Sequence, residues 1–503
     1  MTQKSYNPDV LTCLANLSND EVFTPPTVVN AMLDLLPVEL WSDPEATFLD
    51  PVSKTGVFLR EMAKRLMEGL AERIPDERER ANHIFARQLF AIPITSLTAL
   101  VSRRSVYCSK VANGRFSVCR EFTDEQGNIR YAPTRHTWHN GKCGFCGASE
   151  AVFGHRDGEG LESHAYQFIH TDKPEEIFNM KFDVIIGNPP YQLEDGGNGA
   201  SARPLYHLFV QQAMKLNPRY LCMIIPSRWY CGGKGLDEFR NTMLNESRIR
   251  YLYNYENAKD CFPSNVIGGG VCYFLWDKLY DGLCEYHTMV NGKETNEIRN
   301  LTEFPIFIRF NEAINIIHKV LEYKERTLTQ FISARNPFGI STSERGEEKN
   351  NSIRQCVLYT SKGKAYFSRN RLSLKDSYID CFKIMMGRTI SGHAGETDAN
   401  GQCKVLSTLS ILKPNEICTD TYIVIGNLQS MTYATNICNY LKSKFVRFLI
   451  LQTITSINIT RNNYQFVPLQ DFSKPWNDEQ LYSKYNLTAD EIAFIESMIR
   501  PMD

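Results

Sequence analysis

Short apolar runs alternate with amphipathic stretches along the first 280 residues of the chain. The apolar runs predict buried strands at 47–50, 88–92, 167–171, 183–187, 221–226 and 271–276. Between them, apolar residues recur at helical spacing, as at 57–70, where Phe58, Met62, Leu66 and Leu70 fall on one face. Strands that alternate with helices are typical of a doubly wound, Rossmann-like α/β domain, which we expect over residues 1–300.

The pattern is interrupted twice. About 75 residues separate the second predicted strand from the third, far more than a usual connection, so we expect an insert with its own structure at 101–165. From about residue 301, polar stretches at 341–352 and 391–401 separate short β-prone segments. The chain closes with a helical pattern at 488–499, which begins with the capping signal Thr488-Ala489-Asp490-Glu491. We expect a second, mixed α/β domain over residues 301–503.

Composition is that of a globular protein, with 11% aromatic and 22% charged residues among 503. The sequence contains no apolar run of the roughly 18 to 20 residues that cross a bilayer. The first residues, MTQKSYNPDV, lack the pattern of a secretion signal. These features predict a cytoplasmic protein without a membrane anchor.

Net charge is -1, but basic residues gather locally. Residues 201–250 hold eight Lys or Arg against three acidic residues, and 421–470 hold four against none. Phosphate contacts need local rather than global positive charge, so both stretches are candidate DNA-binding faces, although a solvated surface explains each equally well. The candidate DNA-binding residues are Arg228, Lys234, Lys444, Arg447 and Arg461.

Residues 182–191 read FDVIIGNPPY, an apolar strand that runs straight into a loop with two prolines. Open α/β sheets bind ligands at the carboxyl ends of their strands, where this loop would present Asn188 and Tyr191. Pro189 and Pro190 fix φ and lack N–H groups, so the loop is rigid and its carbonyls are free to accept hydrogen bonds. The Asn188 oxygen and the Pro189 carbonyl suit the two hydrogens of an aromatic amine that attacks a methyl group, and Tyr191 suits stacking on its ring. An ordinary turn after a strand is the alternative.

Residues 48–59, FLDPVSKTGVFL, predict a strand, a tight turn and a helix start. The first such turn of an α/β domain commonly holds a nucleotide-like cofactor, and the helix N-terminus attracts an anionic group. Gly56 would allow close approach of the backbone. Taken alone, this segment is equally well explained as a plain turn.

Together these blocks resemble the adenine-specific DNA methyltransferases of restriction-modification systems, in the motif order called the gamma class. That order has a Thr-Pro segment, the cofactor loop, Asn-Pro-Pro-Tyr and a target-recognition domain. This chain has FTPP at 23–26, the loop at 50–56, Asp172 after the third predicted strand, and NPPY at 188–191. The resemblance covers roughly residues 20–280. The C-terminal part is similar to family recognition domains only loosely, mainly at 421–422 and 444–447.

The resemblance implies methyl transfer from S-adenosylmethionine to N6 of an adenine that is flipped out of double-stranded DNA. It implies catalysis by Asn188, Pro189, Pro190 and Tyr191, and contact of Tyr191 and Phe262 with the flipped base. The cofactor-binding residues it implies are Thr24, Pro25, Asp50, Pro51, Gly56, Asp172 and Asn188. Residues 301–503 would be the target-recognition domain.

Two positions depart from the family pattern. Lys54 stands where the cofactor loop usually has glycine, and 90–93, FAIP, lacks the acid that usually binds the ribose. Cofactor binding would then be weak, use other groups or need a partner subunit. The sequence also shows no phosphate loop of a motor and no nuclease constellation, so any cleavage would reside in a separate endonuclease or helicase subunit.

The predicted insert contains Cys108, Cys119, Cys143 and Cys146, the last two as Cys-Gly-Phe-Cys-Gly. Four thiolates would complete a tetrahedral structural zinc site, with His136 and His139 as possible substitutes. Unrelated buried cysteines are the alternative. With eight basic residues against three acidic ones over 101–146, the insert is also a candidate DNA contact.

Two other functions remain open at this point. Asn-Pro-Pro-Tyr also serves enzymes that methylate glutamine in protein or bases in RNA, although nearly 200 residues after the catalytic domain are better explained as a reader of duplex sequence. Alternatively, the chain is a non-catalytic DNA-binding subunit that has lost cofactor affinity through Lys54 and Pro93. The intact loop at 188–191 argues against this second reading.

Overall fold

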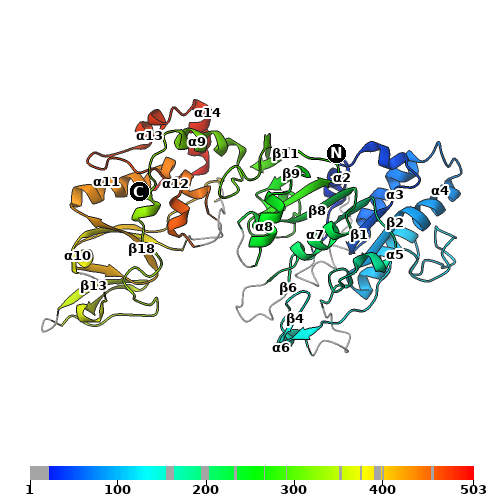
Figure 1. The fold of residues 1–503 in the computed structure, drawn as a ribbon, viewed down its shortest axis with the longest axis horizontal. Helices are drawn as coiled ribbons and strands as arrows, with labels where there is room; N and C mark the ends of the chain where they lie inside the picture. Colours follow the sequence, from blue (N-terminus) through cyan, green and yellow to red (C-terminus); the bar gives the residue numbers. More distant parts are fainter. Residues whose placement is uncertain are drawn as a thin grey trace, which may run out of the picture. The chain divides into compact units, whose positions relative to one another are not determined.

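The computed structural model describes residues 22–502 except 155–163, 194–202, 232–234, 266, 291, 351–353, 374–375, 390–397, 399–400 and 455–457. The chain divides into two compact units, Met1–Glu303 and Phe304–Asp503. Figure 1 shows both. None of the helices in the described part combines the length and apolar character that a bilayer crossing requires.

The first unit is built on one eight-stranded sheet, with strand order β12-β11-β9-β10-β8-β5-β1-β2. The four strands β2, β1, β5 and β8 are parallel, and β10 is antiparallel to both of its neighbours, β8 and β9. The strands are β1 (Phe48–Ser53), β2 (Leu89–Pro93), β5 (Val184–Gly187), β8 (Tyr220–Pro226), β9 (Ile249–Tyr255), β10 (Val271–Asp277), β11 (Cys284–Val290) and β12 (Lys293–Arg299). The carboxyl ends of β1 and β5 therefore lie side by side, which brings the two predicted loops together.

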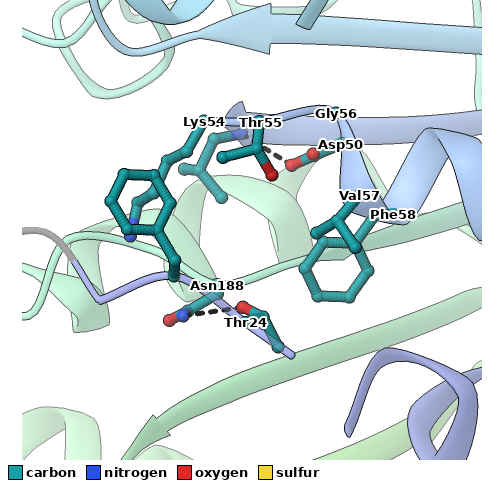
Figure 2. Close-up of a pocket in the computed structure, with 10 residues that line it drawn as sticks. Thr24, Asp50, Lys54, Thr55, Gly56, Val57, Phe58 and Asn188 are labelled. Carbon is teal, nitrogen blue, oxygen red and sulfur yellow. Dashed lines mark hydrogen bonds between the residues drawn. The ribbon is translucent and has the colours of Figure 1, made fainter. Parts of the chain in front are cut away.

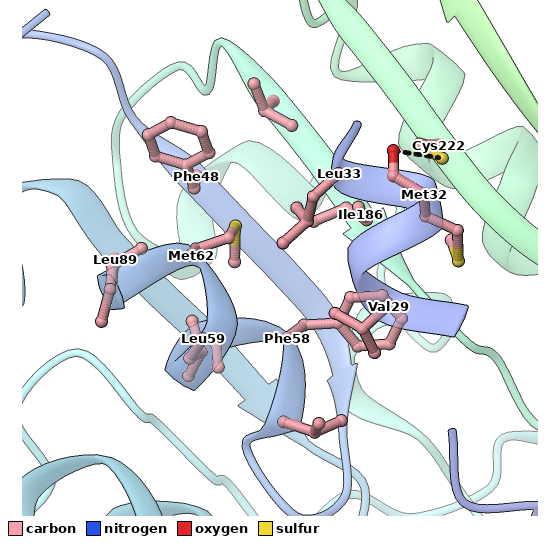
Figure 3. Packing of buried hydrophobic residues seen from close by; sticks show 14 of the residues in the cluster. Val29, Met32, Leu33, Phe48, Phe58, Leu59, Met62, Leu89, Ile186 and Cys222 are labelled. Atoms are coloured by element: carbon pink, nitrogen blue, oxygen red, sulfur yellow. Dashed lines mark hydrogen bonds between the residues drawn. The ribbon is translucent and has the colours of Figure 1, made fainter. Parts of the chain in front are cut away.

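Helix α2 (Pro26–Leu33) precedes β1, and further helices alternate with the parallel strands, as the sequence pattern predicts. These further helices are α3 (Val57–Gly69), α4 (Glu77–His83), α5 (Ser96–Tyr107), α7 (Tyr206–Lys215) and α8 (Asp237–Leu244). Side chains of α2 and α3 form the main core with β1, as Val29, Phe58, Met62 and Phe48 show in Figure 3. Burial of this apolar layer holds both helices, and hence the loops that precede them, against the sheet.

Five of the six predicted strands are confirmed as β1, β2, β5, β8 and β10. The strand predicted at 167–171 is wrong, because this segment begins as a 3-10 helix at Gln167–Ile169. Its buried Phe168 faces α7, with its ring centroid 6.2 Å from that of Phe209, rather than a neighbouring strand. The position beside β2 is taken instead by Ile129, which bridges to Ala91 in parallel.

The described part of the insert contains little regular structure. It has a two-stranded hairpin, β3 (Trp138–His139) and β4 (Lys142–Cys143), and one short helix, α6 (Glu150–Phe153). A second small ribbon joins β6 (Gln192–Leu193) to β7 (Arg203–Pro204) directly after the diproline loop.

The second unit contains two three-stranded sheets, ordered β14-β13-β17 and β16-β15-β18. Side chains of both sheets, among them Leu358 and Met385, share one apolar core. The strands are β13 (Gln355–Thr360), β14 (Gly363–Ser368), β15 (Phe382–Gly387), β16 (Leu409–Leu412), β17 (Glu416–Cys418) and β18 (Tyr422–Leu428). The helices are α9 (Asn311–Glu322), α10 (Asp376–Ile379), α11 (Met431–Lys442), α12 (Lys444–Leu451), α13 (Asp478–Lys484) and α14 (Ala489–Met498). The capping signal before α14 is confirmed, because Thr488 and Glu491 form a capping box.

Candidate active site

The turn between β1 and α3 forms one wall of the site. Gly56 caps α3 with a φ of 73°, and no side chain caps the first turn. A Cβ at Gly56 would lie 2.9 Å from Val106 Cγ2 and 3.2 Å from the Ser102 carbonyl, so this glycine is required where α3 packs on α5. An uncapped helix N-terminus leaves backbone N–H groups that suit a carboxylate.

Asp50 lies in the middle of β1, with 2% of its surface exposed. Its Oδ1 accepts a hydrogen bond of 3.1 Å from the Val52 amide. Burial raises the pKa of this carboxyl to about 7, although the Val52 amide, Ser53 and Lys54 oppose the shift. A cationic group bound beside Asp50 would favour its charged form.

Asn188 follows β5 and is almost fully buried. Its Nδ2 donates to the Val22 carbonyl at 3.1 Å and to Thr24 Oγ1 at 3.0 Å, which fixes the orientation of the amide. Figure 2 shows the Asn188 nitrogen directed at Thr24. The Asn188 Oδ1 atom is buried and has no hydrogen-bond partner among the described residues. A buried acceptor of this kind costs free energy unless a ligand satisfies it.

Lys54 is buried, and its Nζ donates to the Val22 carbonyl at 3.0 Å. The same carbonyl accepts the hydrogen bond from Asn188. The cofactor loop and the diproline loop therefore meet at one backbone oxygen of the segment before α2.

These groups surround a pocket with about 240 Å³ of space not filled by protein atoms, part of it open to solvent. Figure 2 shows the residues that line it. They are Phe23, Thr24, Asp50, Val52, Lys54, Thr55, Gly56, Val57, Phe58 and Asn188. The structure thus brings together Thr24, Asp50, Gly56 and Asn188, which were predicted from the sequence.

Other predicted cofactor residues are not among those that line the pocket. Pro25 is the N-cap of α2, and Pro51 is a buried residue of β1. Asp172 is exposed and follows the 3-10 helix rather than a strand. Its predicted role depended on a strand that does not form.

Tyr191 and Phe262, the two predicted base-stacking residues, belong to the same buried apolar cluster. Pro189 and Pro190 between Asn188 and Tyr191 are also buried. The Tyr191 hydroxyl has no hydrogen-bond partner in the described part of the chain, and burial raises its pKa well above the ordinary value. Both aromatic rings therefore belong to the buried cluster next to the diproline loop.

The predicted set of four cysteines is corrected by the structure. Cys143 and Cys146 are close together, but the other members of their group are His136 and His170. Cys108 is exposed, and Cys119 is buried with its Sγ 3.8 Å from the Asn82 carbonyl. His170 was not predicted from the sequence, because it lies beyond the Cys-x-x-Cys segment and outside the predicted insert.

The five candidate DNA-binding residues fall into different environments. Arg228 and Arg461 are exposed, whereas Lys234 lies outside the described residues. Lys444 forms an ion pair with Glu496. The prediction for Arg447 is wrong, because its side chain is 1% exposed and donates to the carbonyls of Lys442, Ser443 and Arg500.

Sequence reasoning also missed residues of the pocket itself. Lys54 was noted only as a departure, and Phe23, Val57 and Phe58 were not predicted to line a site. Each of these residues adjoins a predicted motif residue, which could have indicated a place in the site. An apolar residue beside a motif is, however, equally well explained as part of the hydrophobic core.

Comparisons with known proteins match this chain to methylases. The family model of the Eco57I restriction-modification methylase matches residues 87–262. A Mycoplasma pneumoniae protein described as an uncharacterized adenine-specific methylase is 39% identical over 313 residues, which is 57% of this chain and 72% of that protein. The type II methyltransferase M.PstI of Providencia stuartii is 24% identical over 216 residues, or 41% of this chain and 40% of that enzyme.

Among solved structures, a nuclease-deletion mutant of the Type ISP restriction-modification enzyme LlaGI, in complex with a DNA substrate mimic, aligns with a TM-score of 0.47 at 12% identity. That alignment covers 92% of this chain and 46% of the LlaGI chain. The extent of the Mycoplasma match decides the relationship: this chain belongs to the family of adenine-specific methylases.

Proposed function

We propose that this chain transfers a methyl group from S-adenosylmethionine to N6 of an adenine at specific sites in double-stranded DNA. The observation that carries the proposal is the buried Asn188 Oδ1, an unsatisfied acceptor on a residue that lines the same pocket as Asp50. An amine hydrogen would satisfy this oxygen, and the pocket beside it would hold the methyl donor. Family membership supports adenine as the base.

The fit of the cofactor rests on three features of the pocket. The Asp50 carboxylate suits the ammonium group of the methionine moiety, and the uncapped N-terminus of α3 suits its carboxylate. Apolar side chains of Val57 and Phe58 line the remainder. When bound, the cofactor supplies an electrophilic methyl group on sulfur.

The loop at 188–191 would act on the base. Asn188 Oδ1 and the Pro189 carbonyl each accept one hydrogen of the amine, which directs the nitrogen lone pair toward the methyl group. Because Nδ2 is held by Val22 and Thr24, the Asn188 oxygen keeps its orientation without the base. Tyr191 and Phe262 would contact the flipped base, whose removal from the duplex gives the loop access to the amine.

The second unit would read the DNA sequence, with exposed Arg461 on that unit and Arg228 on the first as phosphate contacts. The chain would serve as the modification component of a restriction-modification or phage-defence system in the cytoplasm. Its partner would be a separate endonuclease or helicase subunit, and cleavage would reside in a partner rather than in this chain.

Substitution Asn188→Ala tests the mechanism. We expect kcat for methylation of duplex DNA to fall by at least about 10²-fold, since an oriented group that acts in the transition state is lost. Calorimetry should show S-adenosylmethionine binding within about threefold of the parent chain, which would also show that the variant is folded. Asn188→Asp is a close steric control that keeps an acceptor oxygen but loses both hydrogen bonds donated by Nδ2.

Tritium transfer from labelled cofactor to duplex DNA, RNA and a release-factor protein, followed by nucleoside analysis, would identify the substrate. We expect N6-methyladenine in DNA alone. Full activity of the Asn188→Ala variant, or label on RNA or protein only, would contradict the proposal.

A further inference from the structure

We infer that His136, Cys143, Cys146 and His170 bind one Zn²⁺ ion in a closed tetrahedral site, and that this ion fastens the insert to the catalytic unit. The four side chains each offer a ligand atom, and these atoms all lie within 4.8 Å of one another. His136, Cys143 and Cys146 are buried, and His170 is half-buried. The inference does not depend on the proposed methyl transfer.

The distance between one thiol and one imidazole of the group suits tetrahedral zinc. The Cys146 Sγ lies 3.5 Å from the His136 Nδ1. Thiolate and imidazole ligands at about 2.3 and 2.0 Å from a common tetrahedral ion lie roughly 3.5 Å apart. His136 would therefore ligate through Nδ1.

The imidazole of His170 is oriented for a metal by its other nitrogen. His170 Nδ1 lies 2.9 Å from the Tyr166 carbonyl, to which it can only donate. This contact leaves the lone pair on Nε2, an atom that is buried and has no hydrogen-bond partner among the described residues. A ligating histidine commonly donates its second N–H to a backbone carbonyl in this way.

Cys143 and Cys146 lie on one tight turn, here called the knuckle, which backbone hydrogen bonds stabilise. The Gly147 amide donates to the Cys143 carbonyl at 2.9 Å, and the Cys143 amide donates to the Ala148 carbonyl at 2.9 Å. Gly147 has a φ of 69°, in the left-handed region that favours glycine. Both thiols therefore project from one tight turn after β4, as in metal-binding Cys-x-x-Cys motifs.

The charge of this set matches that of the ion. The two thiolates balance the charge of Zn²⁺, after their two protons have passed to solvent. Four protein ligands leave no open position, so the ion would be structural.

The position of His170 means that a bound ion would link the insert to the catalytic unit. The other three ligands belong to the insert, but His170 directly follows the 3-10 helix at Gln167–Ile169, which packs on α7. The knuckle also meets the ribbon after the diproline loop, since a Cβ at Gly147 would lie 2.1 Å from Arg203 Nη1. The ion would thus tie the insert to the segment that precedes β5, next to a knuckle that already contacts the ribbon that follows β5.

The metal content of the untagged full-length chain tests the site. After gel filtration in the presence of a mild chelator, we expect about one zinc per chain by elemental analysis. The variants Cys146→Ser and His170→Ala should each bind zinc at least about 100-fold more weakly. The matched controls Cys108→Ser and Cys119→Ser remove cysteines of the same region and should retain one zinc.

Cobalt reconstitution of the parent chain gives a readout that does not depend on variants. We expect the visible bands of tetrahedral cobalt and charge-transfer absorption from two thiolates rather than four. A parent chain without stoichiometric zinc, or one that binds neither zinc nor cobalt after metal removal, would overturn the inference. Loss of zinc from the Cys108 and Cys119 variants would also overturn it and would restore the four-cysteine set.

Discussion

The charge of the Asp50 carboxyl changes near neutral pH, because burial raises its pKa from 3.8 to about 7. A folded-state pKa above the unfolded value means that stability is fully present below about pH 4 and is lost as pH rises through 7. The ionised carboxylate costs on the order of 4 kcal/mol at alkaline pH, from about 1.4 kcal/mol per pKa unit. Asp50→Asn should therefore raise Tm at pH 8 but not at pH 3.5, as thermal unfolding of the cofactor-free chain would measure.

The same carboxylate is the proposed partner of the cofactor's ammonium group. Affinity of the parent chain for S-adenosylmethionine should fall by about tenfold for each pH unit below 7, and Asp50→Asn should bind weakly at every pH. Calorimetry between pH 6 and 8 measures both, with exposed Asp172→Asn as the control. An Asp50→Asn variant that binds like the parent chain would remove Asp50 from the site.

Motif residues of the pocket could be predicted from sequence. Gly56 and Asn188 were predicted from the local chemistry of their loops, and Thr24 and Asp50 were implied by the family resemblance; all four line one pocket. Contacts made across the fold could not be predicted in this way. Lys54 reaches the Val22 carbonyl, and His170 joins the knuckle, through tertiary packing that no local pattern reports.

At the scale of elements, α12 shows how a basic motif can be structural. Arg447 is buried against three carbonyls, and burial lowers its pKa to about 10. Arg447→Ala should lower the free energy of unfolding by about 2–4 kcal/mol, since it leaves a cavity and carbonyls without donors. Chemical denaturation would measure this loss.

Exposed Arg461 is the matched control for Arg447. Arg461→Ala should change the free energy of unfolding by less than about 0.5 kcal/mol but weaken DNA binding. The reverse pattern, with a stable Arg447→Ala variant that no longer binds DNA, would contradict the structural role of Arg447.

Strands with a continuous apolar run, such as β5 and β10, could be predicted because they are buried on both faces. β9, β11 and β12 were missed, since polar residues interrupt them, as in Lys293–Arg299. A strand was wrongly predicted at 167–171 because this segment contains buried apolar residues although it is not part of a sheet. Phe168 and Ile169 are buried, but against helix α7 and not within the sheet.

At the scale of the whole molecule, the division into Met1–Glu303 and Phe304–Asp503 predicts a division of tasks. A fragment that ends at residue 303 contains the complete pocket. It should bind S-adenosylmethionine within about threefold of the full chain but lose at least about 100-fold in affinity for cognate duplex DNA. Calorimetry and DNA-binding titrations at one fixed salt concentration would test both parts. A fragment that methylates the same sites as the full chain would refute the assignment of the second unit.

The Val22 carbonyl accepts hydrogen bonds from both Lys54 and Asn188, so it couples structural changes in the two loops that carry these residues. One peptide oxygen serves as a common anchor for two loops that are more than a hundred residues apart in sequence. A disturbance of the segment leading into α2 would loosen both loops together, so damage there would impair the pocket and the orientation of the asparagine as one event.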